Sequence, residues 1–229
     1  MIIPLCPQIH CITDELTTSN CYILTQHNHT IIIDPNIFSS IDTYLIRHHS
    51  KPDLVILTHE HCDHISGLNE LREKYPISVI ASTHCSQGIQ DPTANMTRIM
   101  ESYLYFQSQG KTLVTYPKFT CKPADICFED RYTFFWKNHK INIYRVPGHT
   151  PGSCYIDWDN NMFFTGDYLI KDEPVITRLP GGNSEEYHKI GLKLLANIPT
   201  HALIYPGHGM SYSCLLYTSP SPRDRQKSR

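Results

Sequence analysis

The chain has 229 residues, of which 40% are hydrophobic, a formal net charge of −2 and an isoelectric point near 6.7. Its lysines and arginines form no basic stripe, which excludes a typical nucleic-acid-binding protein. No apolar run approaches the roughly 20 residues needed to cross a bilayer, and the start of the chain lacks the basic segment of a signal peptide. We therefore expect a cytoplasmic protein that acts on a small molecule.

Eight short runs rich in Ile, Val, Tyr and Phe, each bounded by turn-forming residues, predict β-strands. In chain order they are 21–24, 31–34, 54–57, 79–81, 141–146, 154–157, 162–165 and 202–205. Helical patterns lie between some of them at 37–49, 66–74, 96–107 and 184–197, the last beginning with a Ser-Glu-Glu capping pattern. Strands followed by helices predict a layered α/β fold, and the absence of a linker predicts one domain over residues 1–213.

Two segments depart from this regular order. The stretch 86–140 is rich in aromatic residues, a pattern that is more often ordinary core, but long insertions are often functional and this one is a candidate lid or substrate insertion. Residues 214–229 have no apolar period and contain two Ser-Pro steps and four basic residues, a composition typical of disorder. Because they also resemble an adaptor sequence translated in frame, we expect a non-native tail.

The nine cysteines argue against two common uses of this residue. They include no Cys-x-x-Cys pair and their number is odd, so neither a disulfide framework nor a zinc ribbon fits. We expect most of them to be reduced thiols in the core.

The most informative segment is 58–64, which reads Thr-His-Glu-His-Cys-Asp-His. A random chain of this composition would carry the HxHxDH spacing in only about three cases in a thousand. His59 and His61 follow an apolar run, so in an extended backbone both side chains leave the same face and can bind one metal ion. The chain then turns into a helix near Ile65, which places Asp63 and His64 to reach a second ion. Glu60 and Cys62 alternate with these residues, and we expect them to point away from the metals.

Three further candidate metal ligands share the same position in the sequence pattern: each follows an apolar predicted strand and lies beside a glycine. They are His149 in Pro-Gly-His-Thr-Pro-Gly, Asp167 after Thr-Gly, and His208 in Pro-Gly-His-Gly. A single residue of this kind is more often part of a turn, but three of them beside HxHxDH favour a metal site. Imidazole and carboxylate ligands suit Zn, Fe or Mn. His84, which ends a predicted strand, is a further histidine that could lie on the same rim.

The segments THEHCDH, PGHTPGS, TGD and PGHG, in this order, resemble the motif set of the metallo-β-lactamase-fold hydrolases. Asn20-Cys-Tyr, Asp34-Pro35 and Arg178-Leu-Pro-Gly-Gly make the pattern similar to the glyoxalase II-like, or hydroxyacylglutathione hydrolase-like, branch. The resemblance covers residues 20–210. It implies an α/β fold of the four-layer αββα type, with two mixed β-sheets flanked by helices and metals at one edge between the sheets.

The resemblance also implies a binuclear site with two divalent metal ions, expected to be Zn, with Fe or Mn as alternatives. One ion would be bound by His59, His61 and His149, the other by Asp63, His64 and His208, with Asp167 bridging them. Two ions roughly 3.5 to 4 Å apart lower the pKa of a shared water, so the expected nucleophile is a metal-bound hydroxide. Asp63 would also act as a catalytic residue by orienting this nucleophile.

The implied reaction is hydrolysis of a thioester, hydroxyacylglutathione-like, or of a related ester, with lactone, phosphoester and β-lactam hydrolysis as alternatives. Glyoxalase II proper continues into a C-terminal helical extension that helps hold glutathione, and this sequence shows no such extension. A mononuclear iron enzyme similar to persulfide dioxygenases is the next alternative. A metal-binding relative without activity is a third, although all seven ligand positions are intact. The sequence indicates no oligomeric state.

Overall fold

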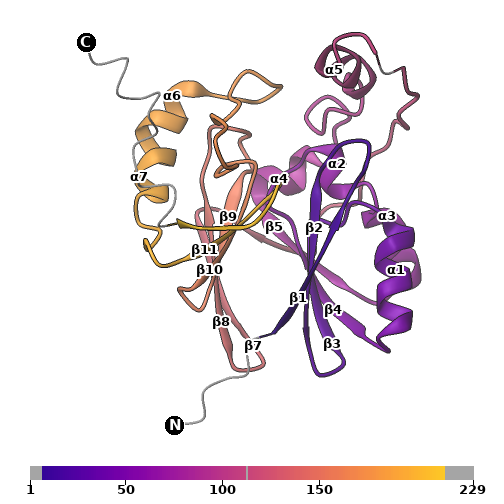
Figure 1. Ribbon diagram of the computed structural model, residues 1–229, viewed down its shortest axis with the longest axis vertical. Helices are drawn as coiled ribbons and strands as arrows, with labels where there is room; N and C mark the ends of the chain where they lie inside the picture. The colour runs from indigo at the N-terminus through magenta and orange to yellow at the C-terminus, as the bar shows by residue number, and fades with distance from the viewer. Residues whose placement is uncertain (1–6, 112, 215–229) are drawn as a thin grey trace.

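The computed structural model describes residues 7–111 and 113–214, and two six-stranded β-sheets form its centre (Figure 1). The first sheet contains, in spatial order, β1 (Gln8–Thr13), β2 (Asn20–Gln26), β3 (His29–Ile33), β4 (Lys51–Ile56), β5 (Ser78–Ser82) and β6 (Ile126–Phe128). The second contains β12 (Tyr212–Ser213), β11 (Leu203–Pro206), β10 (Met162–Gly166), β9 (Cys154–Trp158), β8 (His139–Arg145) and β7 (Arg131–Trp136). Both sheets are mixed, because β3 to β6 and the pair β10 and β11 run parallel while the other neighbours are antiparallel.

The two faces of a strand in the first sheet are buried in two different hydrophobic layers. In β3, Ile31 and Ile33 belong to the cluster that also contains Trp158 and Phe164 of the second sheet, so these side chains fill the space between the sheets. Ile32 belongs to a second cluster, on the outer face of the first sheet. This alternation follows from the two-residue period of a β-strand and explains why β3 is apolar on both faces.

Helices cover both outer faces. Beside the first sheet lie α1 (Phe38–Arg47) and α3 (Leu68–Lys74), and beside the second lie α6 (Ser184–Glu186), a π-helical turn η1 (Tyr187–Gly191) and α7 (Leu192–Leu195) (Figure 1). Helix α1 buries Ile41, Tyr44 and Leu45, the spacing of one helical face. The short helices α2 (Cys62–Ile65), α4 (Thr83–Gly88) and α5 (Met100–Gln107) complete the fold. This confirms the four-layer αββα architecture expected from the sequence.

All eight predicted strands are present, but other boundaries differ from the prediction. The strands β1, β6, β7 and β12 were not predicted; they lie at sheet edges or are short, and β7 alternates exposed and half-buried positions rather than forming an apolar run. The helix expected from position 96 begins at Met100, because Met96 has a φ of +68°. The expected capping by Ser184 is wrong, since the side chain of Asn183 accepts hydrogen bonds from the amides of Glu185 and Glu186.

Within the described residues, no helix is both long and apolar enough to span a membrane. Of the predicted tail, 215–229 lie outside the described residues. The eight cysteines that the structure describes are free thiols, and Cys21, Cys62, Cys85, Cys121 and Cys154 are buried, in agreement with the prediction for most of them.

Candidate metal centre

The seven predicted ligands converge at one end of the two sheets, on segments that follow strand ends. After β4 comes the segment 57–65, which carries His59 and His61 and then the helical turn α2 with Asp63 and His64. This turn begins at Cys62, three residues earlier than the helix expected near Ile65. The remaining three side chains follow β8, β10 and β11, and they are His149, Asp167 and His208.

One group of possible ligand atoms consists of three imidazoles and one oxygen of Asp167. The Nε2 atom of His149 lies 3.2 Å from Nδ1 of His61 and 3.4 Å from Oδ2 of Asp167. The same oxygen lies 3.9 Å from Nε2 of His59. Ligands at 2.0 to 2.1 Å from a tetrahedral zinc ion are about 3.3 Å apart, so these spacings are those of atoms that share a cation.

A second group lies beside the first and uses the other oxygen of Asp167. Oδ1 of Asp167 lies 3.3 Å from Nε2 of His64 and 3.5 Å from Nε2 of His208. The two imidazole nitrogens are 3.4 Å apart, and Oδ2 of Asp63 lies 3.5 Å from His208 and 3.7 Å from His64. Because each oxygen of Asp167 faces a different group, this carboxylate is placed to bridge two cations.

Hydrogen bonds at the outer nitrogens orient the imidazoles of the first loop. The Thr58 hydroxyl donates to Oδ2 of Asp34 at 2.6 Å and lies 3.0 Å from Nδ1 of His59, so its oxygen can accept the proton of that ring. Oδ2 of Asp34 also accepts from Nδ1 of His64 at 3.1 Å. In a neutral ring both contacts place the proton on Nδ1 and direct Nε2 at the site, the arrangement that metal-binding histidines commonly show.

Contacts at Nδ1 also orient the imidazoles of His149 and His208. Nδ1 of His149 donates to the carbonyl oxygen of Ile176 at 2.7 Å, and Nδ1 of His208 lies 3.1 Å from the Thr18 hydroxyl. Asn20 donates to the carbonyl oxygens of Pro206 and Gly209, which holds the turn that carries His208. The sequence had indicated Asn20 and Asp34 only as parts of a resemblance, and these contacts give both residues a physical role.

The chemistry of the cluster fits divalent cations. Nε2 of His59 and Oδ1 of Asp167 are buried and have no hydrogen-bond partner among the described residues. Burial, with a further contribution from His64, lowers the pKa of His59 well below its ordinary value, and burial with His149 lowers that of His61 to about 3, so both rings are neutral. Burial would raise the pKa of Asp167, but His208 and His64 hold it well below its ordinary value. Neutral imidazoles and an ionised carboxylate are the forms that bind metal. Burial would lower the pKa of His64 and His208, but Asp63 and Asp167 raise it, so metal binding at the second group must release protons from these two rings.

Glu60 and Cys62 point away from the ligand cluster, as predicted. Glu60 is buried and accepts a hydrogen bond from the Thr150 hydroxyl at 2.8 Å, which links the HxHxDH segment to the turn carrying His149. Burial raises the pKa of Glu60 to about 7. A Cβ atom at Gly152 would lie 2.4 Å from Oε2 of Glu60, so glycine there makes room for this side chain. Cys62 packs in an apolar cluster with Met96, Met100, Leu104 and Tyr116.

His84 does not join the site. It lies in α4 and belongs to none of the ligand groups found among the described residues. Sequence reasoning did not find Thr58, Thr18 or Ile176. The position of Thr58 next to His59 could have indicated a hydrogen bond to that imidazole. A backbone carbonyl that accepts a hydrogen bond from an imidazole has no signature in the sequence.

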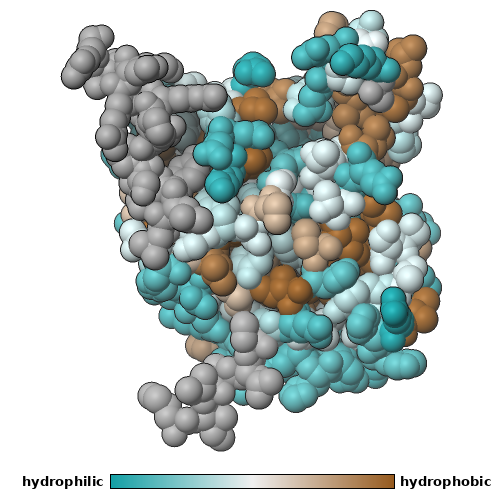
Figure 2. Space-filling model, viewed as in Figure 1, coloured by the Kyte–Doolittle hydropathy of each residue, from teal (hydrophilic) through white to brown (hydrophobic). Residues whose placement is uncertain are grey.

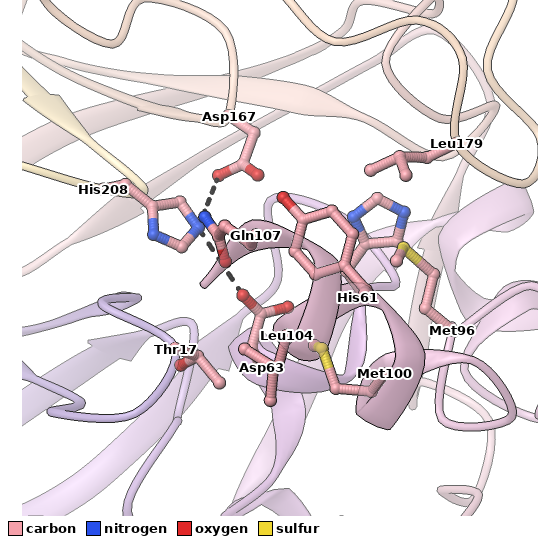
Figure 3. Close-up of a pocket in the computed structure, with 11 residues that line it drawn as sticks. Thr17, His61, Asp63, Met96, Met100, Leu104, Gln107, Asp167, Leu179 and His208 are labelled. Carbon is pink, nitrogen blue, oxygen red and sulfur yellow. Dashed lines mark ion pairs between the residues drawn. The ribbon is translucent and has the colours of Figure 1, made fainter. Parts of the chain in front are cut away.

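A pocket opens onto the ligand cluster (Figure 3). His61, Asp63, Asp167 and His208 form one side of it. The other lining residues come mainly from the 86–140 stretch and are Thr17, Met96, Met100, Tyr103, Leu104, Gln107 and Leu179. In Figure 2, hydrophobic side chains gather on the part of the surface around α5, at the upper right. The stretch considered as a lid therefore supplies much of the pocket wall.

Comparison with known proteins finds relatives that match most of the chain. A probable metallo-hydrolase of Bacillus subtilis, YqgX, is 28% identical over 206 residues, which are 89% of this chain and 91% of that protein. A hydroxyacylglutathione hydrolase of Tolumonas auensis is 24% identical over 197 residues, which cover 86% of this chain but only 63% of that protein. The crystal structure of the BLEG-1 B3 metallo-beta-lactamase superposes with a TM-score of 0.77 at 24% identity and covers 94% of this chain and 99% of that one.

The family is shown by a match whose span contains all seven converging side chains. Residues 15–208 match the pattern of the Metallo-beta-lactamase superfamily, from the segment before β2 to His208 itself. The two ligand groups, the shared Asp167 and the two-sheet core lie within this span. The chain belongs to the metallo-β-lactamase superfamily.

Proposed function

We propose that this chain is a metal-dependent hydrolase that cleaves a thioester, of which hydroxyacylglutathione is one example, or a related ester. The observation that carries the proposal is the pair of ligand groups that face opposite oxygens of Asp167. One ion would be held by His59, His61 and His149, the other by Asp63, His64 and His208, with Asp167 shared. Divalent cations in such a site supply Lewis acidity and lower the pKa of water towards neutrality. Zinc fits these nitrogen and oxygen ligands, and so do iron and manganese.

The side chains that line the pocket would position water and substrate. Burial would raise the pKa of Asp63, but His64 and His208 hold it below its ordinary value, so this carboxylate accepts a hydrogen bond from a water molecule and orients it. The neutral polar groups of Thr17, Tyr103 and Gln107 line the same pocket and are available to donate to a substrate carbonyl. Hydrolysis breaks the carbonyl carbon to sulfur bond and forms a bond to the water oxygen. The products are a carboxylate, a thiol and a proton.

The glyoxalase II-like assignment draws support from the similarity to the Tolumonas auensis hydroxyacylglutathione hydrolase. The similarity to YqgX, a probable metallo-hydrolase, supports the broader hydrolase class without indicating a substrate. We therefore place thioesters first and keep glutathione as one of several thiol carriers to be tested.

The test is turnover of a thioester panel, with S-lactoylglutathione among its members, by protein loaded with Zn, Fe or Mn in parallel. Turnover is expected, and His61→Ala should abolish it while circular dichroism shows an intact fold. His84→Ala is the matched control, because that histidine belongs to no ligand group among the described residues. Oxygen uptake with glutathione persulfide, in place of hydrolysis, would instead identify the mononuclear iron dioxygenase alternative.

A further inference from the structure

The wall of the pocket that faces the ligand cluster is apolar. Met96, Met100 and Leu104 are buried and belong to one hydrophobic cluster, and the half-buried Leu179 packs against it. All four line the pocket, and Figure 3 shows Met100 and Leu104 below the carboxylates and Leu179 above His61. A substrate whose carbonyl lies at the ligand cluster therefore places one of its two arms against thioether and aliphatic side chains.

The lining carries no group that would hold a substrate anion away from the ligand cluster. Among the described residues that line the pocket there is no lysine and no arginine. Arg178 is exposed, acts electrostatically on Tyr103, and is the sequence neighbour of Leu179. It thus lies at the rim and not in the wall. A charged group placed against Met96 and Leu104 would lose its hydration without gaining a partner, which is unfavourable.

The size of the pocket decides which arm of the substrate enters it. Eleven residues line it, four of them predicted ligands, so its apolar wall is only four side chains long. A short acyl chain fits this space, whereas a bulky thiol carrier has to extend towards solvent. The exposed position of Gln107, on the same helix as the apolar wall, is consistent with such an exit on the α5 side.

We propose that α5, with Met96 and Leu179, is an acyl-binding wall that selects thioesters with a short, uncharged, apolar acyl group. This inference rests on the proposed thioester hydrolysis and deepens it. The thiol carrier should then have little influence on which substrates are cleaved. Each methylene buried against the wall should raise kcat/KM about fourfold, so a butyryl thioester should exceed the acetyl thioester by roughly fifteenfold.

The experiment measures kcat/KM for N-acetylcysteamine thioesters of acetate, butyrate, hexanoate and glutarate, together with S-butyrylglutathione. Hexanoyl and glutaryl groups form a matched pair, since they are similar in size and differ in a terminal carboxylate. The expected result is a rise from acetyl to butyryl, at least a tenfold preference for hexanoyl over glutaryl, and butyryl values that differ less than threefold between the two thiols.

Two variants test the wall itself. Leu179→Lys should remove the preference for hexanoyl over glutaryl, because it places a cation beside the acyl chain. Leu104→Ala should lower the ratio of the butyryl to the acetyl kcat/KM about tenfold. Phe106→Ala is the control on the same helix, since Phe106 is 75% exposed and does not line the pocket. Circular dichroism and metal content establish that each variant is folded and loaded.

The outcomes separate the two proposals. No turnover of any thioester overturns the proposed thioester hydrolysis and the acyl assignment with it. A preference for the glutaryl thioester that is lost in Arg178→Ala overturns the acyl assignment alone. That result would show that Arg178, at the rim of the pocket, determines the selectivity. Turnover that depends on the thiol and not on the acyl chain also overturns the acyl assignment.

Discussion

Gly207 lies immediately before His208, and its Cα faces the carboxylate that both ligand groups share. A Cβ atom built at this position would lie 2.3 Å from Oδ1 of Asp167 and 2.9 Å from Cε1 of His64. Real Cβ atoms essentially never approach closer than 3.0 Å, so in Gly207→Ala the Asp167 oxygen must move by at least about 0.7 Å. Metal sites tolerate deviations of about 0.2 Å in ligand distance.

We expect Gly207→Ala to lower zinc affinity by a factor on the order of 10 to 100, the range seen when the support of a metal ligand is disturbed. The assay is competition for zinc with a chromophoric chelator, read together with the number of ions bound. Gly209→Ala is the matched control on the other side of His208. It has a φ of +76° and therefore pays backbone strain of about 1 to 2 kcal/mol, but its Cβ would meet nothing within 4 Å. Unchanged affinity in Gly207→Ala, or an equal loss in Gly209→Ala, would refute the steric reasoning.

Three further perturbations test other contacts. Thr150→Val removes the donor to the buried carboxyl of Glu60 and should lower the free energy of unfolding by about 1 to 3 kcal/mol in urea titrations, whereas Thr150→Ser should not. Hydrogen bonds from Lys74 and Tyr75 lower the pKa of Asp42, so the stability that they contribute is present above about pH 4 and is lost as the pH falls through the folded-state pKa. Asp42→Asn should therefore have a lower free energy of unfolding than the native protein at neutral pH, and the difference should shrink at acid pH. A difference that stays constant with pH would contradict this. A chelator should lower Tm by roughly 8 to 16 °C and zinc should restore it, since a cation at 1,000 times its Kd stabilises the fold by about 4 kcal/mol; a Tm indifferent to both would contradict metal binding.

The clustering of the seven side chains was predictable from the sequence because its signals are local. HxHxDH places four of these side chains within six residues, and His149, Asp167 and His208 each follow an apolar strand beside glycine. The buried strands were predictable for the same reason, since β3 and β10 are runs of Ile or Phe that are buried on both faces.

The contacts that orient the ligands were less accessible because they join segments far apart in the chain. Asp34 meets His64 across 30 positions, and His149 meets a backbone carbonyl at Ile176. The role of Glu60 as a link to Thr150 depends on the packing of two loops and not on the strand alternation that predicted its direction. Helix α5 was expected only as part of a candidate lid, and its apolar pocket face emerges from the placement of Met100 and Leu104 beside the ligand cluster.

The most direct test of the central claim is the number of zinc ions bound per chain, measured by equilibrium titration of metal-free protein and of two variants. The claim that two ligand groups share one carboxylate predicts two ions for the native sequence, one for His61→Ala, and a loss of affinity at both positions for Asp167→Asn. One ion or none in the native protein, or two ions bound with native affinity in Asp167→Asn, would contradict it.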